Sequence, residues 1–230
     1  MSKQNCAIII PCVTVNKETQ LCIERCQKQV KVKVKIYIVS DQKVIFSKRR
    51  KKIKYLSYGP INMSEKRNRA ASLSKEKYMA FIDSDAYPDT NWIESTFKFL
   101  KRKNVGIIAG PHIDPPNQTY FQMIIGLVKK SFLITMLPNF QKQNKEKAQY
   151  VSFIPSANWI LSRKFFNSLK QMDDKMLRNE DWDFVYKMRR TKYKLLYSPN
   201  TLVYHDNNTI FHFIKKRFIY GFYMWPILTK

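Results

Sequence analysis

Two aspartates at the end of one apolar segment offer the clearest chemistry in the sequence. Asp83 and Asp85 flank Ser84 and follow directly after the run YMAFI at 78–82. Carboxylates spaced by one residue can hold a hard divalent cation, and such a cation suits a diphosphate. An acidic loop that caps the next helix is the alternative, but the position after an apolar strand favours the metal site. We therefore predict a metal and diphosphate site at Asp83 and Asp85.

A second acidic group lies in the C-terminal half of the chain. The segment RNEDWDF at 178–184 gathers three carboxylates around Trp182. Glu180 and Asp181 are adjacent at the start of an expected helix, so their side chains point in different directions. One can act as a general base while the other binds acceptor hydroxyls or caps the helix. Trp182 is suited to stack on a sugar or to form a pocket wall. Ordinary helix N-terminal acids are the alternative.

Polar groups also end or begin other segments. Asp41 ends the run IVSD, where a carboxylate can bond a base or a ribose hydroxyl, although a plain turn residue fits too. His205 follows the run TLVY and could ligate a cation or contact phosphate, or be a hydrogen-bonded loop histidine. Arg67 or Arg69 could meet a diphosphate at a helix N-terminus. A solvated basic face is the alternative for that pair.

The elements that must position these residues alternate between strand and helix in the first half. Strands are indicated at 7–10, 32–39, 53–56, 78–82 and 105–109, and helices at 17–29, 64–74, 90–100 and 120–137. The second half indicates extended chain at 151–161, helices at 165–169, 180–190 and 209–229, and strands at 194–197 and 202–204. This order predicts an α/β fold with a mainly parallel sheet flanked by helices.

In such sheets, ligands bind beyond the carboxyl ends of the strands. The segment from Pro11 to Val13, Asp41, and the segment from Asp83 to Asp85 all fall at such ends. Three polar strand ends can converge on one crevice. We therefore expect these groups to form a single ligand site.

Composition limits the class of protein. The 230 residues, 44% of them hydrophobic, suit one compact domain or one domain with a short appendage. A net charge of +25 favours anionic partners such as nucleic acid, acidic lipid or phosphorylated substrates, although a lysine-rich surface alone explains it too. The four cysteines, Cys6, Cys12, Cys22 and Cys26, form no CxxC pair and indicate reduced, buried thiols.

No segment reaches the roughly 18 uncharged apolar residues of a spanning helix. The N-terminus does not have the pattern of a signal peptide, because its apolar stretch is short. Two stretches, 120–137 and 218–229, are apolar with basic residues in or beside them. We interpret both as interfacial segments that lie on a membrane surface.

Taken in order, several segments resemble the family 2 glycosyltransferases. They are AIIIP, IVSD, EKRNRAA, YMAFIDSDA, PSANWILSRKFF, NEDWDF and LLYSPNTLVYH, from Ala7 to about Gly221. The resemblance implies the GT-A fold, a nucleotide-diphosphate sugar as donor, Mn²⁺ or Mg²⁺ as cofactor, and inversion by direct displacement. It places a GT-A domain at 1–206, followed at 207–230 by an amphipathic, membrane-associating helical segment.

The resemblance also implies roles for residues on the donor side. Asp41 would contact the base, Arg67 the nucleotide region, and Asp83 the ribose or the metal. Asp85 would ligate the cation that bridges the phosphates, and His205 would help to hold the metal or phosphate. The expected nucleotide-sugar contacts also include Pro11, Val13 and Ser84. On the acceptor side, Asp181 is similar to the base that deprotonates the attacking hydroxyl, with Glu180 beside it and Trp182 against the acceptor.

These roles imply an enzyme that glycosylates a glycan or a lipid-linked acceptor in cell-surface polysaccharide or glycolipid synthesis. We expect it in the cytoplasm, peripheral on the inner face of an anionic membrane, and we expect no specific nucleic acid as partner. Two alternatives stay open. The charge and the aromatic content also suit a nucleic-acid-binding protein, although zinc-finger, RRM and KH signatures are missing. A catalytically inactive GT-A scaffold is the other, because glycines common in the family near Arg67 and before Glu180 are absent.

Overall fold

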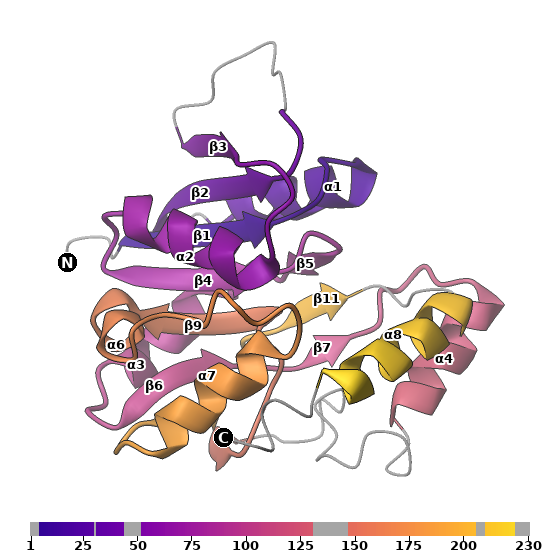
Figure 1. Cartoon of the computed structure of the whole chain (residues 1–230). Helices are drawn as coiled ribbons and strands as arrows, with labels where there is room; N and C mark the ends of the chain where they lie inside the picture. The colour runs from indigo at the N-terminus through magenta and orange to yellow at the C-terminus, as the bar shows by residue number, and fades with distance from the viewer. Residues whose placement is uncertain (1–4, 30, 44–51, 131–146, 206–209, 224–230) are drawn as a thin grey trace.

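The structure is a computed structural model that describes residues 5–29, 31–43, 52–130, 147–205 and 210–223 (Figure 1). Its centre is one eight-stranded sheet. In spatial order, the strands are β3 (Ile53–Ser57), β2 (Lys33–Ser40), β1 (Asn5–Pro11), β4 (Tyr78–Ile82), β9 (Asn158–Ser162), β6 (Val105–Ala109), β10 (Lys194–Tyr197) and β8 (Gln149–Val151).

Most neighbours in this sheet are parallel. Strands β3, β2, β1 and β4 run in one direction, as do β6 and β10. Strand β9 is antiparallel to β4 and β6, and the edge strand β8 is antiparallel to β10. The prediction of a mainly parallel sheet is therefore confirmed.

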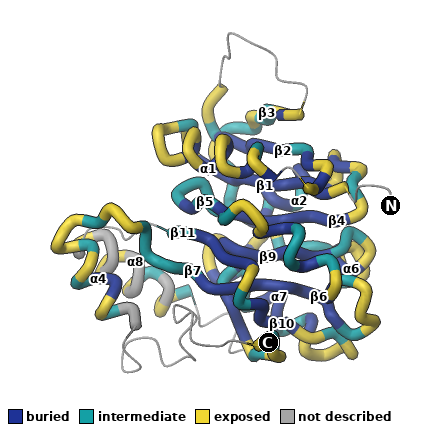
Figure 2. Tube along the Cα trace, turned by 180° about the vertical axis from the view of Figure 1, so that it is seen from behind, coloured by how far each residue is buried: buried dark blue, intermediate teal, exposed yellow. Residues whose placement is uncertain are grey.

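Helices cover both faces of the sheet, which explains why its central strands are apolar throughout. The flanking helices are α1 (Lys17–Gln27), α2 (Met63–Leu73), α3 (Phe97–Leu100), α6 (Arg163–Ser168) and α7 (Glu180–Arg189). Alternate strand residues face opposite layers. Ile9 and Phe81 pack with α2, α6 and α7, whereas Ile8 and Ile10 pack with α1 and α3. Figure 2 shows these strands as the buried centre of the molecule. The four cysteines are buried free thiols, as predicted.

A smaller sheet is built beyond the carboxyl ends of the main strands. It contains β5 (Ala86–Pro88), β11 (Val203–His205) and β7 (His112–Ile113) in the order β5-β11-β7. In the chain, β5 follows β4, β7 follows β6 and β11 follows β10. Strand β11 is antiparallel to β5 and parallel to β7. This sheet brings His205 beside the segment that carries the two aspartates.

Two helices, α4 (Tyr120–Lys130) and α8 (Ile210–Phe222), lie against each other at one end of the molecule, beyond the small sheet (Figure 1). Among the described residues, no helix combines the length and the apolarity that a bilayer span requires. The predicted segments 131–137 and 224–229 lie outside the described residues.

Two predicted elements differ from the structure. The helix expected at 90–100 is a 3₁₀ turn (η1, Glu94–Thr96) followed by the single turn of α3. Before it, Trp92 is buried and donates its indole N–H to the Asn158 side chain at 2.7 Å. The extended run expected at 151–161 is divided into β8 and β9, which do not pair with each other.

Gly110, which follows β6, lies very close to the backbone of the segment that leads into β11. A Cβ atom there would lie 2.1 Å from the backbone oxygen of Thr201 and 2.6 Å from that of Ser198. Backbone atoms cannot move aside as a side chain can, so we expect Gly110→Ala to lower the free energy of unfolding by about 3 kcal/mol. Urea denaturation measures this. Gly221→Ala is the control, because a Cβ there would meet nothing within 4 Å, and equal unfolding curves for the two variants would contradict the prediction.

Candidate functional site

Three predicted ligands gather at the carboxyl end of β4. One ligand atom each of Asp83, Asp85 and His205 can be chosen so that all lie within 4.8 Å of one another. His205 Nε2 lies 3.2 Å from Asp85 Oδ1. The small sheet causes this meeting, because His205 on β11 pairs with Ala86 on β5, next to Asp85. Two carboxylates and an imidazole are a donor set that fits Mn²⁺ and is compatible with Mg²⁺.

Arg67 connects this group to the start of α7. Its guanidinium is 3% exposed and donates to Asp83 Oδ1 at 2.9 Å and to Glu180 Oε1 at 2.7 Å. Burial is the largest influence on the Arg67 pKa and lowers it, but the negative charges of Asp83 and Glu180 together raise the pKa above its ordinary value. The cation is therefore permanent, and it holds β4, α2 and α7 in one arrangement. The other candidate, Arg69, is exposed and pairs with Glu65 instead.

Asp181 lies beside this bridge in the first turn of α7. Its carboxylate accepts hydrogen bonds from the backbone N–H of Ser156 at 3.3 Å and from that of Trp182 at 2.9 Å. Burial, and next the charge of Glu180, raise the pKa of Asp181 to about 7, while Arg67 and the two N–H groups oppose the rise. The residue still keeps some accessible surface. A partly accessible carboxylate that titrates near neutrality is suited to general-base catalysis.

Asp41, predicted to contact the base, has a buried partner that the sequence did not reveal. Lys66 is 1% exposed, and its Nζ lies 2.7 Å from both Asp41 Oδ1 and the backbone oxygen of Cys12. Lys66 and Arg67 are consecutive residues of α2, and each pairs with a carboxylate at a strand end. Helical spacing was the sequence signal that could have indicated the burial of Lys66. It lies four residues before Ala70, which faces the core, and so on the same side of α2.

The ends of β1 and β2 are tied together near Asp41. Pro11 is the buried last residue of β1, and the backbone N–H of Asp41 donates to the Val13 oxygen at 3.1 Å. The Val13 side chain is exposed. Ser84 is half-buried between the two aspartates of the metal group. Because β1 lies between β2 and β4, these residues occupy neighbouring strand ends, as the sequence predicts.

Trp182 has one face of its ring engaged already. It stacks on Phe153 with ring centroids 3.8 Å apart and an interplanar angle of 12°. The residue is half-buried and packs against the core. Contact with an acceptor therefore depends on the remaining surface of the ring, and this role stays a prediction.

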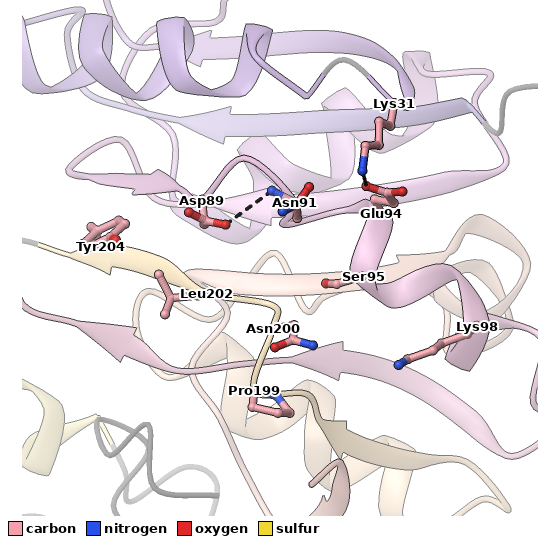
Figure 3. A pocket seen from close by; sticks show the side chains of 10 residues that line it. All are labelled: Lys31, Asp89, Asn91, Glu94, Ser95, Lys98, Pro199, Asn200, Leu202 and Tyr204. Carbon is pink, nitrogen blue, oxygen red and sulfur yellow. Dashed lines mark hydrogen bonds and ion pairs between the residues drawn. The ribbon is translucent and has the colours of Figure 1, made fainter. Parts of the chain in front are cut away.

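Two cavities lie near the small sheet. The larger, about 690 Å³, contains none of the predicted site residues (Figure 3). It is lined by Lys31, Asp89, Asn91, Glu94, Ser95, Lys98, Pro199, Asn200, Leu202 and Tyr204. Its charges are of both signs, and Lys31 pairs with Glu94 at 3.0 Å, so it has no evident preference for a diphosphate. The smaller cavity, about 250 Å³, borders Asp85 and extends to residues 115–117, before α4.

The pair between Lys66 and Asp41 makes a prediction about stability. Replacing Lys66 with methionine leaves the Asp41 carboxylate, 16% exposed, without its cation. We expect the free energy of unfolding to fall by about 3 kcal/mol, and by less when Asp41→Asn is also present. Lys31→Met is the control, since it removes an exposed pair and should cost less than about 1 kcal/mol. Equal effects of the two lysine substitutions in denaturant titrations would count against this account.

Comparison with known proteins gives one family and several relatives. The family model described as "Glycosyl transferase family 2" matches residues 7–170. A protein of Mycobacterium tuberculosis named pre-mycofactocin glycosyltransferase is 25% identical over 171 residues, which is 71% of this chain and 34% of that protein. The chain thus spans about a third of the length of that curated relative.

Solved structures show the same fold. S. aureus TarS, in a crystal structure of residues 1–349, matches with a TM-score of 0.64 and 14% identity, over 88% of this chain and 60% of that one. The crystal structure of GalNAc-T7 with UDP, GalNAc and Mn²⁺ matches with a TM-score of 0.64 and 12% identity, over 89% of this chain and 44% of that one. These neighbours have the GT-A fold, which confirms the predicted architecture.

Proposed function

Because the chain belongs to glycosyl transferase family 2, we propose that it transfers a sugar from a nucleotide-diphosphate donor to a hydroxyl group of an acceptor. The observation that supports this most is the bridge through Arg67. It joins Asp83, which we assign to the donor side, to Glu180, whose neighbour Asp181 we assign to the acceptor side. Donor and acceptor chemistry are thus held in one fixed arrangement.

On the donor side, the cation would be held by Asp83, Asp85 and His205. When bound, it supplies positive charge that stabilises the departing diphosphate. Asp41 follows β2, which is separated from β4 by β1. In this proposal it accepts hydrogen bonds from the base or the ribose. Lys66 fixes the position of that carboxylate through their ion pair at 2.7 Å. The structure of GalNAc-T7 contains UDP and Mn²⁺ on this fold, which supports a donor and a cation of this kind.

On the acceptor side, Asp181 takes the proton from the attacking hydroxyl. The hydroxyl oxygen bonds to the anomeric carbon while the bond from that carbon to the diphosphate breaks, and direct displacement inverts the anomeric centre. The N–H groups of Ser156 and Trp182 fix the orientation of the Asp181 carboxylate. We propose a glycan or a lipid-linked molecule as the acceptor, in cell-surface polysaccharide or glycolipid synthesis.

Calorimetric titration of UDP, GDP and dTDP, each with and without Mn²⁺, tests the donor half of this proposal. We expect one of the three to bind, and its affinity to depend on Mn²⁺. Absence of binding by all three would contradict the proposal and favour an inactive scaffold. Salt-sensitive binding of random duplex DNA, without nucleotide binding, would instead favour the nucleic-acid alternative.

A further inference from the structure

The helix α8 presents an apolar stripe to solvent. Phe211, Ile214, Phe218 and Phe222 are between 60% and 83% exposed. They are spaced by three and four residues, so they lie on one side of the helix. Apolar residues in such a pattern normally face a protein core. Here the stripe faces outward in the described structure.

The neighbouring helix α4 has a similar exposed face. Tyr120, Met123 and Leu127 follow the same helical spacing, and the ring of Phe121 contacts that of Tyr120 from the adjacent side of the helix; all four are between 55% and 75% exposed. Ile125, on the other side of the helix, is buried and anchors α4 to the protein. Because α4 and α8 contact each other, both exposed faces belong to the same end of the molecule (Figures 1 and 2). We call these eight residues the α4–α8 face.

Exposed apolar side chains gathered at one end of a protein often mark a site of interaction with another protein or a membrane. The charges of the two helices decide which partner fits. Neither helix contains an acidic residue, α4 ends in two lysines, and α8 includes Lys215, Lys216 and Arg217. Lys215 is exposed in the turn after Ile214. A second copy bound through the same two helices would offer no acidic side chain to pair with Lys215, which makes it a poor partner.

A partner must therefore be apolar and negatively charged at once, and the surface of an anionic bilayer has both properties. We propose that the α4–α8 face docks on anionic lipid, with its phenylalanines at the boundary of the acyl chains and the adjoining Lys215 among the headgroups. The net charge of +25 attracts the protein to such a surface from a distance.

The connections of the two helices place the candidate site at that surface. In the chain, α4 follows β7 and α8 follows β11. Strands β7 and β11 are parallel neighbours in the small sheet, and β11 carries His205. The cavity of about 250 Å³ lies between Asp85 and residues 115–117, just before α4. Docking would thus hold this cavity beside the lipid surface. Combined with the proposed function, on which this last step rests, the arrangement favours an acceptor carried on a lipid.

Co-sedimentation of the full chain with vesicles tests the proposal. We expect binding to vesicles of phosphatidylglycerol and phosphatidylcholine in equal parts, and much weaker binding to phosphatidylcholine alone. Phe218→Ser should weaken binding about tenfold, since it removes one side chain from the apolar contact. Lys215→Gln should weaken it about fivefold on anionic vesicles and leave binding to neutral vesicles unchanged.

The matched control is Leu73→Ser, an exposed leucine at the end of α2, which should leave vesicle binding unchanged. Circular dichroism would show that all variants are folded. No binding to anionic vesicles would overturn the proposal, as would full binding by Phe211→Ser/Phe218→Ser. A concentration-dependent dimer that Phe218→Ser dissociates, without vesicle binding, would instead identify an interface between copies. Titration with nucleotide and Mn²⁺ in the same samples tests the proposed function separately, so the two can fail independently.

Discussion

Replacing Asp85 with alanine should abolish the Mn²⁺-dependent part of nucleotide binding and lower kcat/KM about 1,000-fold. Asp85 offers one of the three ligand atoms of the candidate metal group, and the ion pairs of the described site join Arg67 to Asp83 rather than to Asp85. Loss of one of three protein ligands leaves Asp83 and His205, which are too few to hold the cation firmly against the diphosphate. A loss of this size corresponds to about 4 kcal/mol of transition-state stabilisation.

Calorimetry with and without Mn²⁺ measures the binding part of this prediction, and a glycosyl-transfer assay measures the catalytic part. Asp89→Ala provides the control, because Asp89 is an acidic residue of the larger cavity and not of the metal group (Figure 3). If Asp85→Ala retained Mn²⁺-dependent binding at the affinity of the unmodified chain, the assigned metal group would be wrong.

Replacing Asp181 with asparagine should lower kcat by about 100- to 10,000-fold while nucleotide affinity stays within a few-fold. The amide keeps the shape of the carboxylate but cannot accept the proton of the acceptor hydroxyl. In the unmodified chain, the carboxylate must be ionised to act. Because its pKa is about 7, kcat/KM should rise with pH and level off above that value. The variant should lack this rise.

Glu180→Gln tests whether the pKa of Asp181 sets the midpoint of the pH profile of kcat/KM. The charge of Glu180 raises the pKa of Asp181, and its loss also leaves Arg67 with one carboxylate fewer. Both changes favour the ionised form of Asp181, so the midpoint of the pH profile should move to lower pH. Unchanged pH profiles in both variants would show that another group accepts the proton.

Much of the site was predictable because strand ends are recognisable in the sequence. Asp83 and Asp85 follow an apolar run that proved to be β4, and His205 ends the run that proved to be β11. Their meeting depends on the register of the small sheet, which short segments such as AYP and HI do not reveal. The sequence therefore predicted that these three residues lie at one edge of the sheet, but not the strands that bring them together.

The role of Lys66 was not predictable in the same way. Lysines are rarely buried unless a partner is present, and a basic helix start suggests solvent exposure. Only the fold shows that α2 turns Lys66 and Arg67 inward and Arg69 outward. The buried side of α2 is centred on Arg67, Ala70 and Ala71, and Leu73 at the end of the helix is exposed.

The order of the small sheet also affects when the candidate site is completed during synthesis. Asp83 and Asp85 emerge from the ribosome long before His205, because β11 is the last strand of the chain that the structure describes. Until β11 is in place, β5 lacks the neighbour that it has in the described small sheet, and the two aspartates lack His205. Firm cation binding is thus expected only from a chain that has folded as far as β11.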